Sequence, residues 1–329
     1  MDGHGRCRPL TAFLIPFIVI LLLLLPIHLA AQESNFPPGK AGFAIKFNGV
    51  VSPYTIMSRF LMPREELNVE VISRGTSGIF SYKAEGGLIL SQAGRSLKWR
   101  APETSGLYKI IISRSAPVDS IILNVFVMVS MARMEGEYQN GYRIGKYPKK
   151  WYKDLPSYKA PEGFIEVTRE VENTRLTPHF TLKQFICKQS GDYPRYMVLR
   201  EKLLIKLELI LEKINEKGYY CRTLSILSGF RTPYYNRQIG NVKYSRHQWG
   251  GAADIFIDER PKDNMMDDLN RDGKINWKDA AIVYDIINEL FAIPGYEYLR
   301  GGLARYKKTA SHGPFVHVDV RGWPARWGF

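Results

Sequence analysis

The stretch that decides the fold of the C-terminal half reads SRHQWGGAAD, from Ser245 to Asp254. Its histidine, His247, and its carboxylate, Asp254, lie seven residues apart with four small residues between them. Glycine and alanine allow the backbone to turn tightly, so both side chains are able to reach one point, as a shared metal ion requires. The stretch therefore predicts half of a metal site.

A matching half lies near the C-terminus, in the run FVHVDVR over residues 315–321. Polar and apolar residues alternate there, which predicts a strand with His317, Asp319 and Arg321 on one face and three valines facing the core. The residues that follow Asp254 predict a second strand. Two histidines and one aspartate form a ligand set of catalytic zinc sites, in which a further position is left for water.

These motifs resemble the zinc D-alanyl-D-alanine carboxypeptidase family, whose fold is shared with the Hedgehog signalling domain. The resemblance is carried by Ser245-x-His247-x-x-Gly250-x-Ala252-x-Asp254, by the later His317-Val318-Asp319, and upstream by SGFRTP at residues 228–233 with Asn236. It spans about residues 180–329 and leaves the N-terminal half uncovered. It implies that His247, Asp254 and His317 bind zinc, with Asp319 or Ser245 orienting a ligand.

The same resemblance implies two catalytic residues, Arg231 and His312, which lie sixteen residues before the first ligand and five before the last. A guanidinium suits the developing oxyanion or the terminal carboxylate of a substrate, and a histidine is able to deliver a proton to the leaving amine. A second branch of the family uses a glutamate three residues before the last ligand, where this chain has Pro314. That difference favours the carboxypeptidase branch and leaves the proton-transfer group open.

A second metal motif, DLNRDGKINWKD at residues 268–279, lies between the two halves of the zinc site. Its oxygen side chains at positions 1, 3, 5, 9 and 12, with glycine at position 6, are typical of a calcium loop and resemble the loops of dockerin modules. The predicted calcium ligands are Asp268, Asn270, Asp272, Lys274, Asn276 and Asp279. The alternative is that Asn276 caps a helix over residues 277–291, with Asp279 at its third position.

The N-terminal residues 1–31 have the pattern of an export signal. Arg6 and Arg8 precede an apolar run over residues 10–25, and Pro26 interrupts it before the small pair at residues 30 and 31. The run is shorter than the roughly 20 residues of a membrane-spanning helix. The sequence predicts export to the periplasm or cell envelope. An uncleaved membrane anchor through residues 10–31 is the alternative.

Length and composition limit the class of protein to which the chain can belong. The chain has 329 residues, a net charge of +14, 45% hydrophobic residues and three cysteines. These values exclude a disordered chain and a disulfide scaffold, and they allow two domains. An exported basic protein is expected to meet anionic cell-wall polymers and not nucleic acid, although the charge also serves solubility. Pairing of Cys187 with Cys221 and the oligomeric state stay open.

The chain divides into three segments after the signal. Residues 41–130 contain short β-branched and aromatic runs between turn residues, which predict an antiparallel, immunoglobulin-like sandwich that acts as a spacer or docking domain. Residues 131–178 predict an irregular arm, whose aromatics and lysines suit packing onto a neighbour or, alternatively, stacking on sugar rings. Residues 179–329 predict an α+β zinc peptidase domain with a helix over residues 195–217.

The sequence thus predicts an exported zinc metallopeptidase of the D-Ala-D-Ala carboxypeptidase type that acts on peptidoglycan stem peptides. Two alternatives stay open. One is an endopeptidase of the same fold that cleaves another bond of the wall. The other is a metal-stabilised wall-binding module without catalysis, as Hedgehog-type domains can be.

Overall fold

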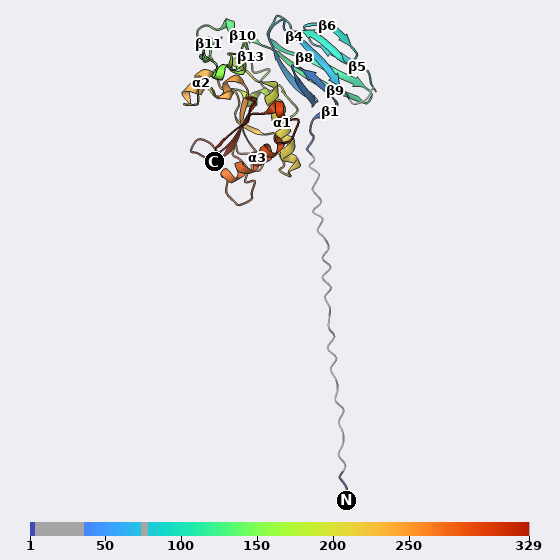
Figure 1. Cartoon of the computed structure of the whole chain (residues 1–329), viewed down its shortest axis with the longest axis vertical. Helices are drawn as coiled ribbons and strands as arrows, with labels where there is room; N and C mark the ends of the chain where they lie inside the picture. The colour runs from blue at the N-terminus through green and yellow to red at the C-terminus, as the bar shows by residue number, and fades with distance from the viewer. Residues whose placement is uncertain (4–35, 74–77, 329) are drawn as a thin grey trace. The chain divides into compact units, whose positions relative to one another are not determined.

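The computed structural model describes residues 1–3, 36–73 and 78–328 (Figure 1). The predicted export signal or anchor lies almost wholly outside the described residues and stays a prediction. Within the part of the chain that is described, no helix combines the length and the apolar character that crossing a membrane needs. The fold is mixed α and β, with more strands than helices.

Two sheets form the N-terminal segment, drawn in blue to cyan in Figure 1. Their orders are β2-β1-β4-β7-β6 and β3-β9-β8-β5. The strands are β1 (Lys40–Phe47), β2 (Val50–Tyr54), β3 (Ile56–Leu61), β4 (Glu66–Ile72), β5 (Phe80–Ala84), β6 (Leu88–Ala93), β7 (Ser96–Arg100), β8 (Gly106–Ser115) and β9 (Val118–Val127). Side chains along β4 are alternately exposed and buried, as a strand with one face on a core requires.

One pairing in this segment departs from the antiparallel prediction. Strands β3 and β9 run parallel, with Ile56 opposite Ile122 and Leu61 opposite Val127. Only Thr55 separates β2 from β3, so the chain passes from one sheet to the other without reversing its direction. The immunoglobulin-like character of the two sheets stays a prediction.

A segment of short elements follows β9; it includes the predicted arm at residues 131–178 and extends beyond it to residue 197. Its members are β10 (Val129–Ser130), η1 (Met131–Arg133), β11 (Tyr138–Gln139), β12 (Tyr142–Arg143), η2 (Tyr152–Asp154), η3 (Pro156–Tyr158), β13 (Gly163–Val167), η4 (Leu182–Phe185) and β14 (Arg195–Met197). Strands β10, β13 and β14 form a small sheet.

The C-terminal half is built on a five-stranded sheet of order β15-β16-β18-β17-β19, shown in orange and red in Figure 1. Its elements are α1 (Glu201–Glu216), β15 (Ser225–Ser228), α2 (Pro233–Gln238), η5 (Arg246–Trp249), β16 (Ala252–Phe256), α3 (Trp277–Leu290), η6 (Glu297–Leu299), β17 (Gly302–Tyr306), β18 (Phe315–Asp319) and β19 (Ala325–Gly328). The sheet is antiparallel except for the β17–β19 pair at its edge, which is parallel. Helix α3 contacts β17 and β18, and α1 contacts α3.

The predicted helix over residues 195–217 begins six residues later than its pattern suggested. Residues 195–197 form β14 because they pair with β13, where Met197 lies opposite Ile165. From Glu201 onward the apolar positions of α1 are buried, and Gly218 follows the helix with a φ of +86°. Cys187 and Cys221 are both buried free thiols, so they do not form the disulfide that the sequence left open.

Candidate metal centre and active-site cavity

The sheet brings the second and third predicted zinc ligands together. Strands β16 and β18 pair antiparallel, and Asp254 lies directly opposite His317 in their register. Val316 and Val318 are fully buried, as predicted, but the polar side chains of β18 are buried as well, so burial does not alternate along this strand. The long segment between the two strands therefore returns the chain to the same place on the sheet.

The first ligand comes from the turn that precedes β16. His247 lies in η5, which ends at Gly250 with a left-handed φ of +62°. A β-carbon at residue 250 would lie 2.2 Å from the carbonyl oxygen of Val198, so only glycine fits there. Gly250 thus has a structural role, because it lets the chain turn from η5 into β16 against the neighbouring backbone.

The three side chains form a buried cluster with the composition of a metal site. One potential ligand atom from each of His247, Asp254 and His317 lies within 4.8 Å of the others. Asp254 Oδ1 is 2.8 Å from His317 Nδ1 and 3.3 Å from His247 Nε2. Among the described residues this is the one group of three or more His, Cys, Asp or Glu side chains with such spacing.

Hydrogen bonds outside the cluster select the nitrogen that each histidine offers. His247 Nδ1 lies 2.6 Å from the carbonyl oxygen of Gly229, which accepts its proton and leaves Nε2 to face Asp254. His317 Nε2 lies 3.2 Å from Asp319 Oδ2 and donates to it, so Nδ1 is the nitrogen that faces Asp254 and is placed to bind a metal. Two ring nitrogens that give up a proton on metal binding and one carboxylate, each held from behind, are the donors that zinc takes. The residues present therefore fit a zinc ion.

Asp319 is the residue that orients His317. Its buried carboxylate also accepts hydrogen bonds from Arg321 Nη2 at 2.5 Å and from the backbone N–H of Gly302 at 2.8 Å. Burial acts to raise the pKa of Asp319, but the bonds from His317 and Arg321 outweigh it and hold the pKa well below its usual range. Asp319 is therefore a permanent anion behind the ligand.

Burial and neighbouring charges have opposing effects on the pKa values of the three ligands. Burial lowers the pKa of His247 below its usual value. Burial also acts to lower the pKa of His317, but its bonds to Asp254 and Asp319 prevail and raise the pKa. For Asp254, burial favours the neutral acid, yet the two imidazoles hold its pKa well below the usual range. The carboxylate is thus kept ionised, as a metal ligand must be.

Arg231 lies in the site, where it touches a ligand directly. Its Nη2 donates to Asp254 Oδ2 at 2.5 Å, and its Nε donates to Ser228 Oγ at 2.7 Å. The sequence predicted that Arg231 contacts the substrate. In the structure its guanidinium bonds to Asp254 Oδ2, whereas Oδ1 of the same carboxylate faces the two histidines. Arg231 accordingly acts at least as a positioning residue for Asp254.

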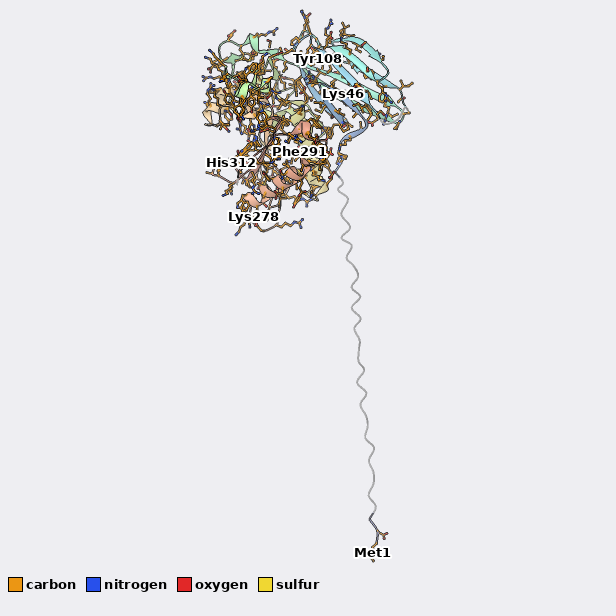
Figure 2. The ribbon with its side chains drawn as sticks, viewed as in Figure 1. Met1, Lys46, Tyr108, Lys278, Phe291 and His312 are labelled. Carbon is orange, nitrogen blue, oxygen red and sulfur yellow. The ribbon has the colours of Figure 1, made fainter. Side chains whose placement is uncertain are left out.

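The cluster opens into a cavity of about 1050 Å³. His312, labelled in Figure 2, lines this cavity from the loop between β17 and β18. Its Nδ1 lies 2.8 Å from the carbonyl oxygen of Gly313, so Nε2 is the nitrogen left for another partner. The structure therefore brings His312 to the same cavity as the three ligands and Arg231.

The cavity has a cationic and aromatic lining that the sequence did not assign to the site. Its walls include Lys188, Lys243, Arg246, Arg321, Tyr152, Tyr158, Tyr235, Tyr244, Tyr306, Phe315 and Trp327, whereas Asp254 is the only carboxylate among its lining residues. Burial, and then the nearby charge of Arg200, lower the pKa of Arg246 to about 10. Partial burial lowers the pKa of Lys188. Arg246, Phe315 and Arg321 lie in the two runs that carry the ligands, whereas no local motif marks the others, because they come from separate segments of the chain.

The predicted calcium loop shows the helix cap that was its alternative. The side chain of Asn276 accepts from the backbone of Lys278, and Asp279 completes a capping box at the start of α3. Asp279 is buried, and its carboxylate accepts the backbone N–H groups of Leu269, Asn270 and Asn276. Asp268 accepts from the backbone of Asp272 and Gly273. Calcium binding stays a prediction.

Comparison with known proteins agrees with the geometry. Residues 178–274 match the model of a family described as peptidase M15. The match includes His247, Asp254 and Arg231 and ends before His312, which lies in the loop between β17 and β18, and before His317 on β18. Searches of curated proteins and of solved structures found no match. Residues 178–274, which carry Arg231, His247 and Asp254, are therefore similar to the zinc metallopeptidases of the peptidase M15 family.

Proposed function

We propose that the chain is a zinc carboxypeptidase of the D-Ala-D-Ala type that acts on peptidoglycan stem peptides. The observation that carries this proposal is the buried cluster of His247, Asp254 and His317, which faces a cavity lined by cations. A peptidase of this type has to bind a substrate with a free carboxylate, and a site with one acidic and several basic residues attracts such a group. The predicted export would bring it to that polymer.

Each residue of the site has a separate role in the proposed reaction. Zinc held by the three ligands would polarise the scissile carbonyl and lower the pKa of a water molecule. Arg231 keeps the carboxylate of Asp254 in place and Asp319 keeps the ring of His317 in place. His312, with its Nε2 available, delivers a proton to the leaving amine. Lys188 and Arg321 are placed on the cavity wall to attract the substrate's carboxylate.

A second candidate is an endopeptidase that cuts within the peptide or its cross-links. The size of the cavity favours it, because about 1050 Å³ lies at the upper end of the range for sites that bind drug-sized ligands. A terminal dipeptide alone fills only part of such a volume. Both candidates use the same ligands and the same proton donor, so only the products separate them.

We also propose that the loop over residues 268–279 binds calcium in a structural role. What supports it is the spacing of oxygen side chains at Asp268, Asn270, Asp272 and Asn276. The loop lies in the segment between β16 and β18, so a bound ion would stabilise the connection between the strands of Asp254 and His317.

Digestion of purified peptidoglycan by the zinc-loaded protein, followed by mass spectrometry, tests the function. Loss of one terminal alanine supports the carboxypeptidase, and separated cross-links support the endopeptidase. A His247→Ala, His317→Ala double variant should lose both zinc and activity. His312→Ala should keep its zinc and turn over on the order of a hundredfold more slowly. Intact peptidoglycan after digestion by the zinc-loaded wild type would contradict both candidates.

A further inference from the structure

The arm lies outside the residues that match the peptidase family, yet it is fixed to the turn that carries His247. The hydroxyl of Tyr147 donates to the carbonyl of Gln248 at 2.9 Å, and Trp249 Nε1 donates to the carbonyl of Lys159 at 2.9 Å. Arg246 Nη1 donates to the carbonyl of Ser157 at 2.9 Å. The arm is therefore held in place relative to the metal ligands.

This attachment places aromatic rings of the arm beside rings of the peptidase domain. Tyr152 lies 5.3 Å from Tyr244 between ring centroids, and its ring is nearly parallel to that of Trp323, at 14° and 6.5 Å. Tyr152 and Tyr244 line the active-site cavity, and all three rings are half-buried. We name Tyr152, Tyr244 and Trp323 the aromatic wall.

Buried groups support the aromatic wall from behind. The ring of Tyr158 lies 5.2 Å from Tyr152 and 6.1 Å from Tyr244. The guanidinium of Arg246 lies 4.4 Å from the centre of the Tyr158 ring, and Tyr244 donates its hydroxyl proton to the carbonyl of Lys150 at 3.0 Å. Tyr158 already fills the space behind the wall. Packing alone therefore does not explain why the three rings of the wall are partly exposed to solvent.

Each ring of the wall has a cation beside it. Lys153 lies 5.5 Å from the Tyr152 ring, Lys243 lies 5.4 Å from the Tyr244 ring, and Arg321 lies 6.0 Å from the Trp323 ring. The C–H groups on the face of a sugar ring carry a partial positive charge and pack on the negative faces of aromatic rings. The cations suit a ligand that also carries carboxylates.

We propose that the aromatic wall binds a sugar ring of the glycan to which the stem peptide is attached. This inference rests on the proposed function and extends it, because it makes the glycan-linked peptide the preferred substrate over the free peptide. Tyr152 and Tyr244 line the same cavity as the metal ligands, and Trp323 packs beside Tyr152, so a single substrate molecule is able to occupy the wall and the metal site at once.

The test compares two substrates on the zinc-loaded full chain. One is a free stem pentapeptide, and the other is the same peptide attached to the disaccharide of N-acetylglucosamine and N-acetylmuramic acid. The wild type should have the lower KM for the disaccharide-peptide. In Trp323→Ala and in Tyr152→Ala, the ratio of the two KM values should shift about tenfold against the disaccharide-peptide, with kcat changing less. Trp323→Phe, which keeps a ring, should restore most of the ratio.

Trp277→Ala is the matched control, because Trp277 is a 41% exposed tryptophan at the start of α3 that lies beside Arg305 and not beside Tyr152. It should leave the KM ratio unchanged. An unchanged ratio in Trp323→Ala and Tyr152→Ala, with zinc content equal to that of the wild type, would overturn the aromatic wall while the peptidase function stands. If the wild type cleaves neither substrate, the failure belongs to the proposed function instead.

Discussion

Asp319 shows how much a single residue contributes to the metal site without touching the metal. It accepts from the ring of His317, from the guanidinium of Arg321 and from the backbone of Gly302, and it is fully buried. These bonds determine which nitrogen of His317 faces Asp254. A partner of this kind raises the basicity of the ligand and limits its rotation.

We therefore expect Asp319→Asn to lower zinc affinity by about 10- to 100-fold. The neutral amide loses the charge that stabilises the histidine and Arg321, so the ligand is weaker even if the fold persists. Competition with a zinc chelator measures the affinity. Asp258→Asn is the control, because Asp258 is also buried but bonds to Ser225 and to the backbone of Asp263 and Asn264, away from the ligands. Equal losses in both variants would contradict a specific role for Asp319.

One carboxylate, that of Asp279, caps helix α3 and also belongs to the predicted calcium loop at residues 268–279. Asp279 accepts three backbone N–H groups, two from the loop and one from Asn276, the N-cap residue of α3, and is fully buried. These hydrogen bonds form the helix cap. Asp268 and Asp272 belong to the loop alone, so the two effects are separable by mutation.

Calcium should raise the melting temperature of the zinc-loaded wild type, and much less that of Asp268→Ala, Asp272→Ala. A ligand present at a hundred times its Kd stabilises the folded state by about 2.7 kcal/mol. Asp279→Ala should instead lose about 1–2 kcal/mol in the absence of calcium, because the helix cap is removed. Scanning calorimetry at fixed zinc measures both. A wild-type melting temperature that stays constant from micromolar to millimolar calcium would show that the loop is only a capped turn.

At the scale of the whole molecule, hydrogen bonds connect the N-terminal sheets to α1 and to the segment that precedes it. Arg59 on β3 donates to Glu201 at 2.6 Å, and the hydroxyl of Tyr54 donates to Glu212 at 2.8 Å. Ser58 donates to the carbonyl of Leu176 at 2.9 Å. The described residues from Phe36 onward accordingly form one compact unit, and the N-terminal sheets are more than a loosely linked spacer.

Arg59→Ala should destabilise the protein by about 3 kcal/mol, since removing one partner leaves Glu201 nearly buried without its cation. The side chains of Arg59 and Glu201 are only 13% and 11% exposed. Arg64→Ala is the matched control, because the Arg64–Glu103 pair is 69% and 72% exposed and its loss should leave stability close to that of the wild type. Denaturant unfolding compares the two variants. Equal midpoints would show that the contact between the N-terminal sheets and α1 contributes little.

Local patterns in the sequence by themselves determined several elements of the C-terminal half and the positions of its metal ligands. The alternation over residues 315–321 predicted β18 and the shared face of His317 and Asp319, because side chains of a strand alternate with a period of two. The spacing in residues 245–254 predicted the turn and the strand that bring His247 and Asp254 together. The cap of α3 was also readable, because Asn276 and Asp279 act within one helical turn.

Only the tertiary structure decided the remaining features, because their partners lie far apart in the chain. Arg231 reaches Asp254 across 23 residues and His317 reaches it across 63, so no spacing rule announced the hydrogen bond from Arg231 or the nitrogen that each histidine offers. Residues 195–197 became a strand through pairing with β13, against their helical pattern. Tyr152 joined the cavity because the backbone of the arm bonds to the turn of His247, a contact that composition alone does not encode.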